Sequence, residues 1–423
     1  MKGIAQNKLY KVLSLNAVSV GVSLVLGVIS TKIISIFLGT QGMALMGSLR
    51  NFVAMLKSAA TLGISNSAVR LLVEYKEDKE ELSGIYATFF WIFLSVSAVL
   101  GLFVFATAGP VSAFLFQTDA YVLPLRVFAL ALPLVVLNTF WLAVYNALEL
   151  FRKIIIIQIL SNIIIFGITV LLVWEGNLAG GLLSVAIAEA AIVAVTYFFI
   201  RQHPEYFRFD WRKAINRKHT AVIGSFSAMA LLSAVLTPLT LILVRNHIID
   251  TQSLEQAGVW DGVLRLSGFY MIFFHSGLSL YYMPKLSGIN DDTGFRHELK
   301  LYFKTLVPLF AMMLLLLYFL RGWVVGLAFT DAFSGMNDVL AWQLAGDFLR
   351  IMTLAFGFQV LVKTMMREYF FIEIAFNATF LVLSYLLLPT EGIAGALQAY
   401  CWANAFGLLI VLFIFRKLLF ARS

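Results

Sequence analysis

The chain of 423 residues is 61% hydrophobic and only 13% charged, with a formal net charge of +8. Soluble domains are about 45–50% apolar and about 25% charged, so this composition excludes an ordinary soluble enzyme or a nucleic-acid-binding protein and indicates a membrane protein. At about 20 apolar residues per crossing, the apolar content suffices for about twelve transmembrane helices. The single cysteine, Cys401, excludes an internal disulfide or a multi-cysteine metal site.

Long apolar stretches, interrupted by glycine, proline or clustered charge, predict where the chain crosses the membrane. The N-terminus superficially resembles a signal peptide, because Lys2, Lys8 and Lys11 precede an apolar segment. That segment runs for about 26 residues without a small-residue cleavage site, so we interpret it as a retained first span. We therefore predict an all-α polytopic membrane protein. Its twelve predicted spans are 10–37, 41–66, 82–109, 121–148, 152–174, 178–200, 219–244, 257–284, 299–321, 339–363, 366–388 and 391–415.

The distribution of lysine and arginine predicts the orientation. With the N-terminus inside, most of the 31 basic residues fall on the inner connections, whereas the outer ends carry little beyond Arg126, Arg245 and Arg321. Cytoplasmic loops are enriched in lysine and arginine. We therefore expect a protein of the bacterial inner membrane with both termini in the cytoplasm, and we attribute the positive charge to topology rather than to a binding patch.

Comparing the chain with itself reveals a repeat at one constant shift, the shift that carries Gly47 onto Gly262. One shift that serves several separate helices indicates more than chance similarity between apolar segments. Six crossings return a chain to the same side of the membrane, so the two halves would have parallel orientation around a central cavity, an architecture typical of transporters. The matching pairs are Gly47-Ser48-Leu49-Arg50 with Gly262-Val263-Leu264-Arg265, Arg152 with Arg367, Asn162 with Asn377, and residues 178–182 with residues 393–397.

The repeat predicts a division into two six-helix lobes. The N-terminal lobe would comprise residues 1–200 and the C-terminal lobe residues 219–423, joined by a basic cytoplasmic linker at 201–218.

Charged groups inside predicted spans are candidates for function, because each costs about 2.5–3.5 kcal/mol at a helix centre on insertion scales. Arg50 and Lys57 lie seven residues apart on one face of the second span, and that span contains no carboxylate. They require a partner elsewhere, water or an anionic ligand. We predict that Arg50 has a functional role, and that its repeat counterpart Arg265 lies near the same central cavity.

The acidic candidates allow two interpretations. Asp261 lies four residues before Arg265, and Asp347 lies three residues before Arg350, so each pair could either neutralise itself and join helices or serve transport. Glu189 lies in the sixth predicted span. Two further polar residues are interpreted as structural. Glu373 lies near the cytoplasmic end of the eleventh span, and His275 is expected to be a packed or hydrogen-bonded side chain.

The run from Phe37-Leu38-Gly39 through Gly42 and Arg50 to Leu62-Gly63-Ile64 resembles Wzx-type polysaccharide flippases of the multidrug/oligosaccharidyl-lipid/polysaccharide exporter superfamily. The segments Gly258–Val263 and Tyr282–Ser287 share this resemblance. The segment Trp342-Gln343-Leu344-Ala345-Gly346-Asp347, followed by Arg350, is very similar to the tenth span of the enterobacterial common antigen (lipid III) flippase branch and of related O-antigen translocases.

The resemblance implies a MATE-like fold in which twelve helices form two lobes around a cationic cavity. It implies that the chain moves an undecaprenyl-pyrophosphate-linked glycan, such as an O-antigen or common-antigen repeat unit, to the periplasmic leaflet by alternating access. The cavity residues Arg50, Lys57, Arg265 and Arg350 would then bind the pyrophosphate. Inward H⁺ or Na⁺ could drive transport through Asp261, Asp347 or Glu189. Membrane lipid and polysaccharide polymerase or chain-length proteins are the other expected partners, without a cofactor or metal.

Two positions depart from the family. The branch has a small polar residue at the position of Arg265 and a lysine at that of Arg350, so the cavity would carry extra positive charge. A MATE-like multidrug or ion antiporter remains an alternative, although such exporters commonly carry a carboxylate in the first span and residues 10–37 contain none. A lipid II flippase of the same fold is the other alternative, although it usually has two further helices.

A membrane glycosyltransferase or ligase is the remaining alternative. Such enzymes need sizeable extramembrane loops with catalytic acids or metal ligands, whereas the predicted outer loops have about 5–15 residues, and no nucleophile motif or phosphate-binding glycine loop is present. The carboxylate pair Asp291-Asp292 follows Gly288 on an inner loop and is interpreted as solvating a turn. We therefore predict a transporter and not an enzyme.

Overall fold

The computed structural model describes residues 2–62, 69, 72–75, 78–202, 217–289 and 291–420, with the side chains of 2–16, 79–80, 217–228, 280 and 420 left out. Within this part of the chain the secondary structure is helical and contains no strand. The helices are α1 (Lys2–Phe37), α2 (Gly39–Ala60), α4 (Lys79–Ala106), α5 (Ala108–Phe116), α6 (Val122–Ala147), α7 (Phe151–Arg201), α8 (Arg217–Thr251), α9 (Leu254–Gly277), η2 (Leu278–Tyr282), α10 (Met283–Ser287), α11 (Asp292–Phe319), α12 (Arg321–Ala328), η3 (Asp331–Phe333), α13 (Met336–Val362), α14 (Met366–Glu391), α15 (Ile393–Ile414) and α16 (Arg416–Phe420).

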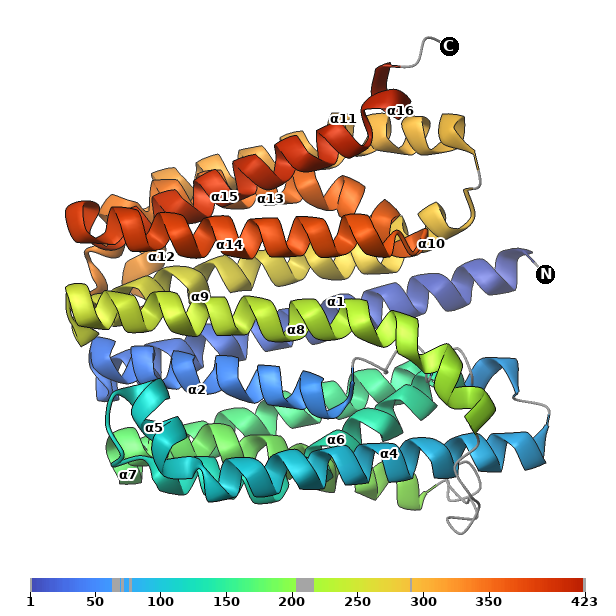
Figure 1. The fold of residues 1–423 in the computed structure, drawn as a ribbon, viewed down its shortest axis with the longest axis horizontal. Helices are drawn as coiled ribbons and strands as arrows, with labels where there is room; N and C mark the ends of the chain where they lie inside the picture. Colours follow the sequence, from blue (N-terminus) through green and yellow to red (C-terminus); the bar gives the residue numbers. More distant parts are fainter. Residues whose placement is uncertain are drawn as a thin grey trace. The chain divides into compact units, whose positions relative to one another are not determined.

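The chain forms two compact units. Unit 1 comprises Met1–Leu38 and Ser48–Val235, and unit 2 comprises Gly39–Gly47 and Leu236–Ser423. Within unit 1, α6 packs against α7 and α4, and α1 packs along α7; within unit 2, α15 packs against α13 and α14, and α13 also contacts α9 and α11 (Figure 1). Most of the predicted linker at 201–218 lies outside the described residues, so the predicted lobe boundaries remain a prediction.

Each of the twelve predicted spans overlaps a long helix, although residues 63–66 of the second span lie outside the described residues. Nine helices of the described chain are long and apolar enough to cross a membrane. α7 covers two predicted spans. Its 51 residues correspond to about 76 Å, which far exceeds a hydrocarbon core of about 30 Å. Its backbone is non-helical at Asn177, between the two predicted spans. α2 and α9 are not among these nine helices, and twelve crossings remain a prediction.

The predicted repeat recurs in the backbone. Asn177 has φ 49° and ψ −134°, and Gly392, its counterpart at the same shift, has φ 58° and ψ −147° between α14 and α15. Glu149 and Thr364, which the same shift relates, both have positive φ, at 56° and 53°. Positive φ is uncommon for residues other than glycine. Its recurrence at the predicted shift shows that the two halves share turn geometry as well as sequence.

Side-chain contacts follow the same repeat. The Asn162 Nδ2 donates to Ser23 Oγ at 2.6 Å in unit 1, and the Asn377 Nδ2 donates to Thr237 Oγ1 at 3.4 Å in unit 2. In both halves, therefore, the fifth predicted helix is tied to the first by the matching asparagine. A polar link between apolar helices fixes their register within a membrane protein.

The short helices α5 and α12 were not predicted. α5 follows α4 and α12 follows α11, which are the third long helices of the two halves. The predicted spans ended at 109 and 321, with loops beyond them. Helices of nine and eight residues are too short to span a bilayer, and their apolar sequence hides the boundary with the preceding span.

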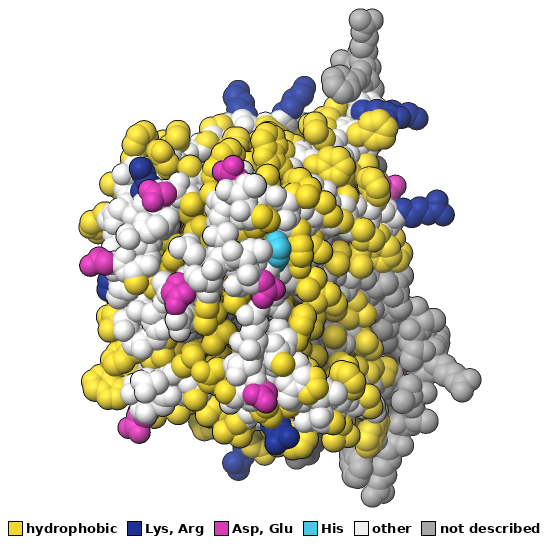
Figure 2. Space-filling view, turned by 60° about the vertical axis from the view of Figure 1, so that its left-hand side comes forward, with side chains coloured by type: hydrophobic (Ala, Val, Ile, Leu, Met, Phe, Trp, Pro, Cys, Tyr) yellow, Lys and Arg dark blue, Asp and Glu magenta, His cyan; other side chains and the backbone are white. Residues whose placement is uncertain are grey.

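Large apolar side chains lie exposed on the described surface. The exposed fraction is 77% for Phe319, 69% for Trp174 and 68% for Trp323. Figure 2 shows many hydrophobic side chains on the visible face, with separate acidic and basic groups between them. A surface of this kind is stable against lipid acyl chains rather than water. It agrees with a multi-pass membrane protein.

Candidate functional site

A buried ion pair lies within unit 2. The Arg245 Nε and Nη2 of α8 donate to Asp261 Oδ2 and Oδ1 of α9 at 2.6 and 2.5 Å, and Arg245 is fully buried. The guanidinium fork thus meets the carboxylate bidentately. The predicted span ended at residue 244, whereas α8 continues to Thr251 and therefore includes Arg245. The pair was not predicted from the sequence, because the two residues lie on different helices and share no helical spacing.

Small residues allow α2 to approach this pair closely. A Cβ added to Gly47 would lie 2.5 Å from Asp261 Oδ1, and one added to Gly258 would lie 1.9 Å from the carbonyl oxygen of Thr40. The ring of Trp260 lies 5.4 Å from the Arg245 guanidinium carbon. The first half of α2 and the start of α9 are therefore in backbone contact beside the buried charges, which only glycine permits.

Two of the predicted site residues meet in unit 1. The Lys57 Nζ lies 2.9 Å from Glu189 Oε2, and the two side chains are 34% and 25% exposed. The partner that Lys57 requires therefore comes from α7. Arg50 is half-buried on α2 within unit 1, and Arg265 is half-buried on α9 within unit 2. A shared cavity for these two arginines remains a prediction.

Asp347 is the centre of a polar cluster within unit 2. Its carboxylate is fully buried and accepts hydrogen bonds from four uncharged side chains on three helices. These are Ser267 Oγ to Oδ2 at 2.6 Å, Tyr270 OH to Oδ2 at 2.5 Å, Gln343 Nε2 to both oxygens at 3.1 and 3.2 Å, and Tyr400 OH to Oδ1 at 2.8 Å. A buried carboxylate is stable only when its oxygens are satisfied in this way.

Asp347 and Arg350 are connected through a third residue. The Arg350 Nη1 donates to the hydroxyl oxygen of Tyr400 at 3.4 Å, while the same hydroxyl donates to Asp347. Within the described chain the two residues are thus linked through Tyr400 and not by a direct ion pair. Their spacing along one helix suggested direct pairing, because it could not reveal a tyrosine that a different helix, α15, brings between them.

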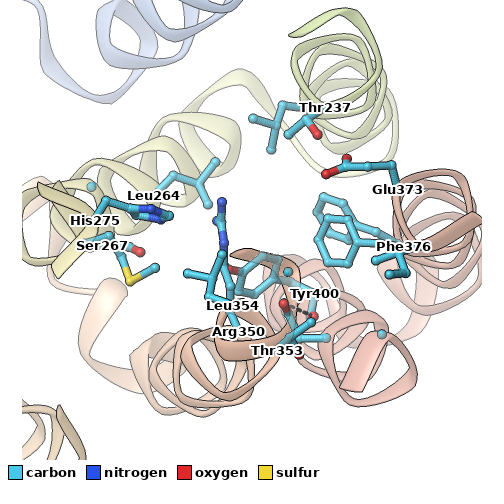
Figure 3. A pocket seen from close by; sticks show the side chains of 18 of the residues that line it. Thr237, Leu264, Ser267, His275, Arg350, Thr353, Leu354, Glu373, Phe376 and Tyr400 are labelled. Carbon is cyan, nitrogen blue, oxygen red and sulfur yellow. Dashed lines mark hydrogen bonds between the residues drawn. The ribbon is translucent and has the colours of Figure 1, made fainter. Parts of the chain in front are cut away.

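Arg350 points into a cavity of about 520 Å³ enclosed by α8, α9, α13, α14 and α15 of unit 2. Figure 3 shows its guanidinium directed towards the interior, with the Glu373 side chain approaching from α14 and His275 from α9. Glu373 and His275 therefore line the cavity. Both were interpreted as structural from the sequence. Phe376 and Phe380 form much of its aromatic wall, in edge-on contact with Tyr400.

The acidic pair at 291–292 has a structural role. The Asp291 side chain caps α11 by accepting from the backbone N–H of Gly294 at 3.1 Å, and a hydrogen bond from Thr293 lowers the pKa of its carboxyl. Nearby, Lys285 forms an ion pair with Glu298 at 2.7 Å, and this hydrogen bond raises the pKa of the Lys285 ammonium. Both arrangements stabilise the start of α11.

No group of three or more His, Cys, Asp or Glu side chains in the described residues is arranged to hold a metal ion. The chemistry available in the described cavity is therefore charge-assisted hydrogen bonding by arginine, together with contacts to aromatic rings and hydroxyl groups.

The chain is similar in sequence to known proteins. The sequence model of a family described as "Polysaccharide biosynthesis protein" matches residues 33–338. The chain is 26% identical over 395 residues to the lipid III flippases of Escherichia coli (strain K12) and Shigella flexneri, covering 90% of this chain and 91% of each relative.

Solved structures of similar fold include the lipid II flippase MurJ in an inward closed conformation. It has a TM-score of 0.77 at 14% identity, with 95% of this chain and 87% of that chain covered. An inward-facing multidrug resistance MATE family transporter of the MOP superfamily has a TM-score of 0.74 at 14% identity, with 95% and 96% covered. These similarities confirm the predicted MATE-like, all-helical fold.

Proposed function

Because the chain belongs to the family of polysaccharide biosynthesis proteins, we propose that it is a flippase that moves a lipid-linked oligosaccharide across the bacterial inner membrane, from the cytoplasmic to the periplasmic leaflet. The observation that carries this proposal is the similarity to lipid III flippases over nine-tenths of both chains. Those relatives are named as transporters and not as enzymes. We assign this chain an undecaprenyl-pyrophosphate carrier and an oligosaccharide repeat unit as substrate.

A flippase is needed because the head of such a lipid cannot cross hydrocarbon unaided. Its charges and hydroxyl groups would lose their hydration, at a cost of several kcal/mol for each unpaired polar group. Guanidinium groups in a wet cavity replace that hydration with charge-assisted hydrogen bonds, while the polyprenyl tail remains in the lipid. We assign substrate binding to Arg50, Lys57, Arg265 and Arg350, and we infer alternating access of the two halves.

The contacts of Lys57 and the acidic candidates refine this proposal. A phosphate that binds Lys57 must compete with Glu189, which lies 2.9 Å from its ammonium group. Asp261 and Asp347 are nearly or fully buried, whereas Glu189 is a quarter exposed. We therefore place any coupling to inward H⁺ or Na⁺ at Glu189 in preference to the other two. Export of each negative charge also gains about 2.3 kcal/mol per 100 mV of inside-negative potential.

Proteoliposomes containing a fluorescent undecaprenyl-pyrophosphate oligosaccharide test the function directly. A membrane-impermeant quencher reports how fast the head group changes leaflet. We expect Arg50→Ala to slow translocation about tenfold or more, since one charge-assisted contact contributes about 1.5–3 kcal/mol. Arg265→Ala should act in the same direction and Arg50→Lys should retain part of the rate.

Arg416→Ala is the matched control, because Arg416 is exposed at the start of α16 and stacks on Phe413. It should translocate at the wild-type rate. Wild-type rates for both Arg50→Ala and Arg265→Ala would contradict the cationic mechanism. Absence of translocation by the wild-type protein would contradict the flippase function itself.

A further inference from the structure

The proposed flippase function does not by itself explain the arrangement of charged side chains around the cavity of unit 2. Among its described lining residues, Arg350 is the one lysine or arginine, and Glu373 is the one carboxylate. Asp347 lies behind the wall and is fully buried. The charges that a ligand would meet are therefore one positive group and one negative group, approached from different helices (Figure 3).

The hydrogen bonds around Tyr400 fix the direction of its hydroxyl group. A tyrosine hydroxyl carries one proton, and here that proton is donated to Asp347 Oδ1 at 2.8 Å. Towards Arg350 the oxygen of Tyr400 can therefore act only as an acceptor, as its contact with Nη1 at 3.4 Å requires. Asp347 thus orients a neutral acceptor that contacts the guanidinium directly, while the charges of Asp347 and Glu373 act on it from further away.

Among the described residues, this arrangement leaves most of the guanidinium available to a ligand. Arginine carries five N–H donors in a planar fork, and the contact with Tyr400 uses one of them. The fork matches two oxygens of a phosphate or carboxylate, and an apolar, aromatic wall strengthens such a contact because it lowers the local dielectric constant. The T-shaped contacts of Phe376 and Phe380 with Tyr400, at centroid distances of 6.2 and 5.8 Å, support the tyrosine ring.

We propose that the cavity of unit 2 is a binding site for a single oxyanion, a phosphate or a carboxylate, on the guanidinium of Arg350, and that Asp347, acting through Tyr400, is the residue that positions this guanidinium. One cation facing one carboxylate suits a group of single negative charge better than a pyrophosphate, which requires several cations. Glu373, on the neighbouring helix, can accept a hydrogen bond from a hydroxyl group of the same ligand. That the oxyanion belongs to the transported lipid rests on the proposed function, whereas the site itself does not.

Phenylglyoxal, an arginine-selective reagent, tests the site without any transport assay. The full-length protein in lipid nanodiscs is treated with the reagent in the presence of inorganic phosphate, acetate or chloride, and modification of Arg350 is followed by peptide mass spectrometry. We expect phosphate or acetate to slow modification of Arg350 about fivefold or more relative to chloride, because a bound oxyanion occupies the fork. Modification of the exposed Arg416 should be insensitive to the anion.

The two oxyanions separate the possible sources of the ligand. Protection by phosphate alone assigns the site to a phosphate group, and protection by acetate alone assigns it to a carboxylate. Equal rates of Arg350 modification in all three anions would overturn the proposed site, whatever the protein transports.

Tyr400→Phe tests the positioning role, because it removes the hydroxyl group and keeps the ring. We expect the affinity of Arg350 for the protecting anion to fall about tenfold, the effect of one lost hydrogen bond to a charged group. Asp347→Asn should weaken it in the same direction. Tyr302→Phe is the matched control: its hydroxyl is also buried in unit 2 and donates to the carbonyl oxygen of Ile351 at 2.9 Å, but Tyr302 does not line the cavity.

A double-mutant cycle in the translocation assay separates positioning from general stability. Tyr400→Phe should slow the wild-type protein about tenfold but change the Arg350→Ala variant less than about twofold, since contacts that act through one residue are not additive. Equal slowing in both backgrounds, or anion protection unchanged by Tyr400→Phe, would overturn the positioning role. A wild-type protein that fails to translocate would contradict only the proposed function, because the protection experiment stands independently.

Discussion

The ion pair of Arg245 and Asp261 is among the most costly arrangements in the molecule. Removing two charges from water costs several kcal/mol per ion, and the attraction between them compensates only when the geometry is excellent. Two parallel hydrogen bonds of 2.6 and 2.5 Å, with Arg245 fully buried, meet this condition. Removal of one partner would leave an uncompensated charge, at a cost of about 3–5 kcal/mol.

Gly47→Ala tests how tightly this pair is enclosed. Its new Cβ would meet Asp261 Oδ1 at 2.5 Å, so the carboxylate must move away from Arg245. We expect a lower midpoint of thermal unfolding in detergent. Gly167→Ala is the control, since no atom lies within 4 Å of an added Cβ there, and alanine is favoured over glycine in a helix by about 1 kcal/mol. Equal shifts for the two variants would contradict close contact at Gly47.

Individual site residues were more predictable than their partners. Lys57 and Glu189 were each identified from the sequence because a charge inside an apolar span is costly. The two residues of this ion pair lie 132 positions apart in the chain, on different helices. No spacing along one helix can reveal such a contact. Tyr400 was not identified as a site residue from the sequence, because a tyrosine within an apolar span is ordinary. Its role depends on the buried carboxylate that it contacts.

Among the helices, the break within α7 best shows how the repeat constrains local structure. Asn177 and Gly392 occupy equivalent positions and share a backbone conformation with positive φ and strongly negative ψ. Glycine adopts such conformations readily, whereas other residues held in sparsely populated regions cost about 1–3 kcal/mol each. The first half of the protein therefore carries strain that the second half avoids.

Asn177→Gly should accordingly stabilise the protein, and Gly392→Asn should destabilise it. The expected change is about 1–3 kcal/mol in each direction, measured as a shift in the thermal unfolding midpoint of the purified protein. The two variants exchange the residues of equivalent positions, so each serves as the control of the other. Shifts of the same sign would show that the backbone at these positions is not the source of the difference.

Helix positions were predictable because apolar length and the constant shift of the repeat both constrain them. The boundaries between α4 and α5 and between α11 and α12 were not. Thr107 and Leu320 are the residues at these boundaries. Neither is a glycine or proline, the residues that usually indicate the end of a helix. Continuous hydrophobicity indicates burial or lipid contact, but it does not specify where the backbone changes direction.

Across the whole molecule, charge distinguishes the two ends of the helices, as the ends of unit 2 show. The end of unit 2 that contains α10 and α16 carries Lys285, Lys363, Arg367, Arg416 and Lys417, together with the acidic Asp291, Asp292, Glu298 and Glu368. The other end carries the acidic side chains Asp250, Glu255, Asp331, Asp338 and Glu391, with Arg321 as a basic residue. Cytoplasmic connections are enriched in lysine and arginine. The end with α10 and α16 is therefore expected to face the cytoplasm.

Single cysteines introduced at the two ends test this orientation. Cys401 is buried, and Cys401→Ala provides a background without other thiols. In intact spheroplasts, a membrane-impermeant maleimide should label Asp331→Cys, because Asp331 lies exposed between α12 and α13. It should label Lys417→Cys, which is exposed on α16, only after the membrane is permeabilised. The reverse pattern would place the basic end outside. An anionic head group would then be carried from the opposite leaflet, which would contradict export as well as the predicted topology.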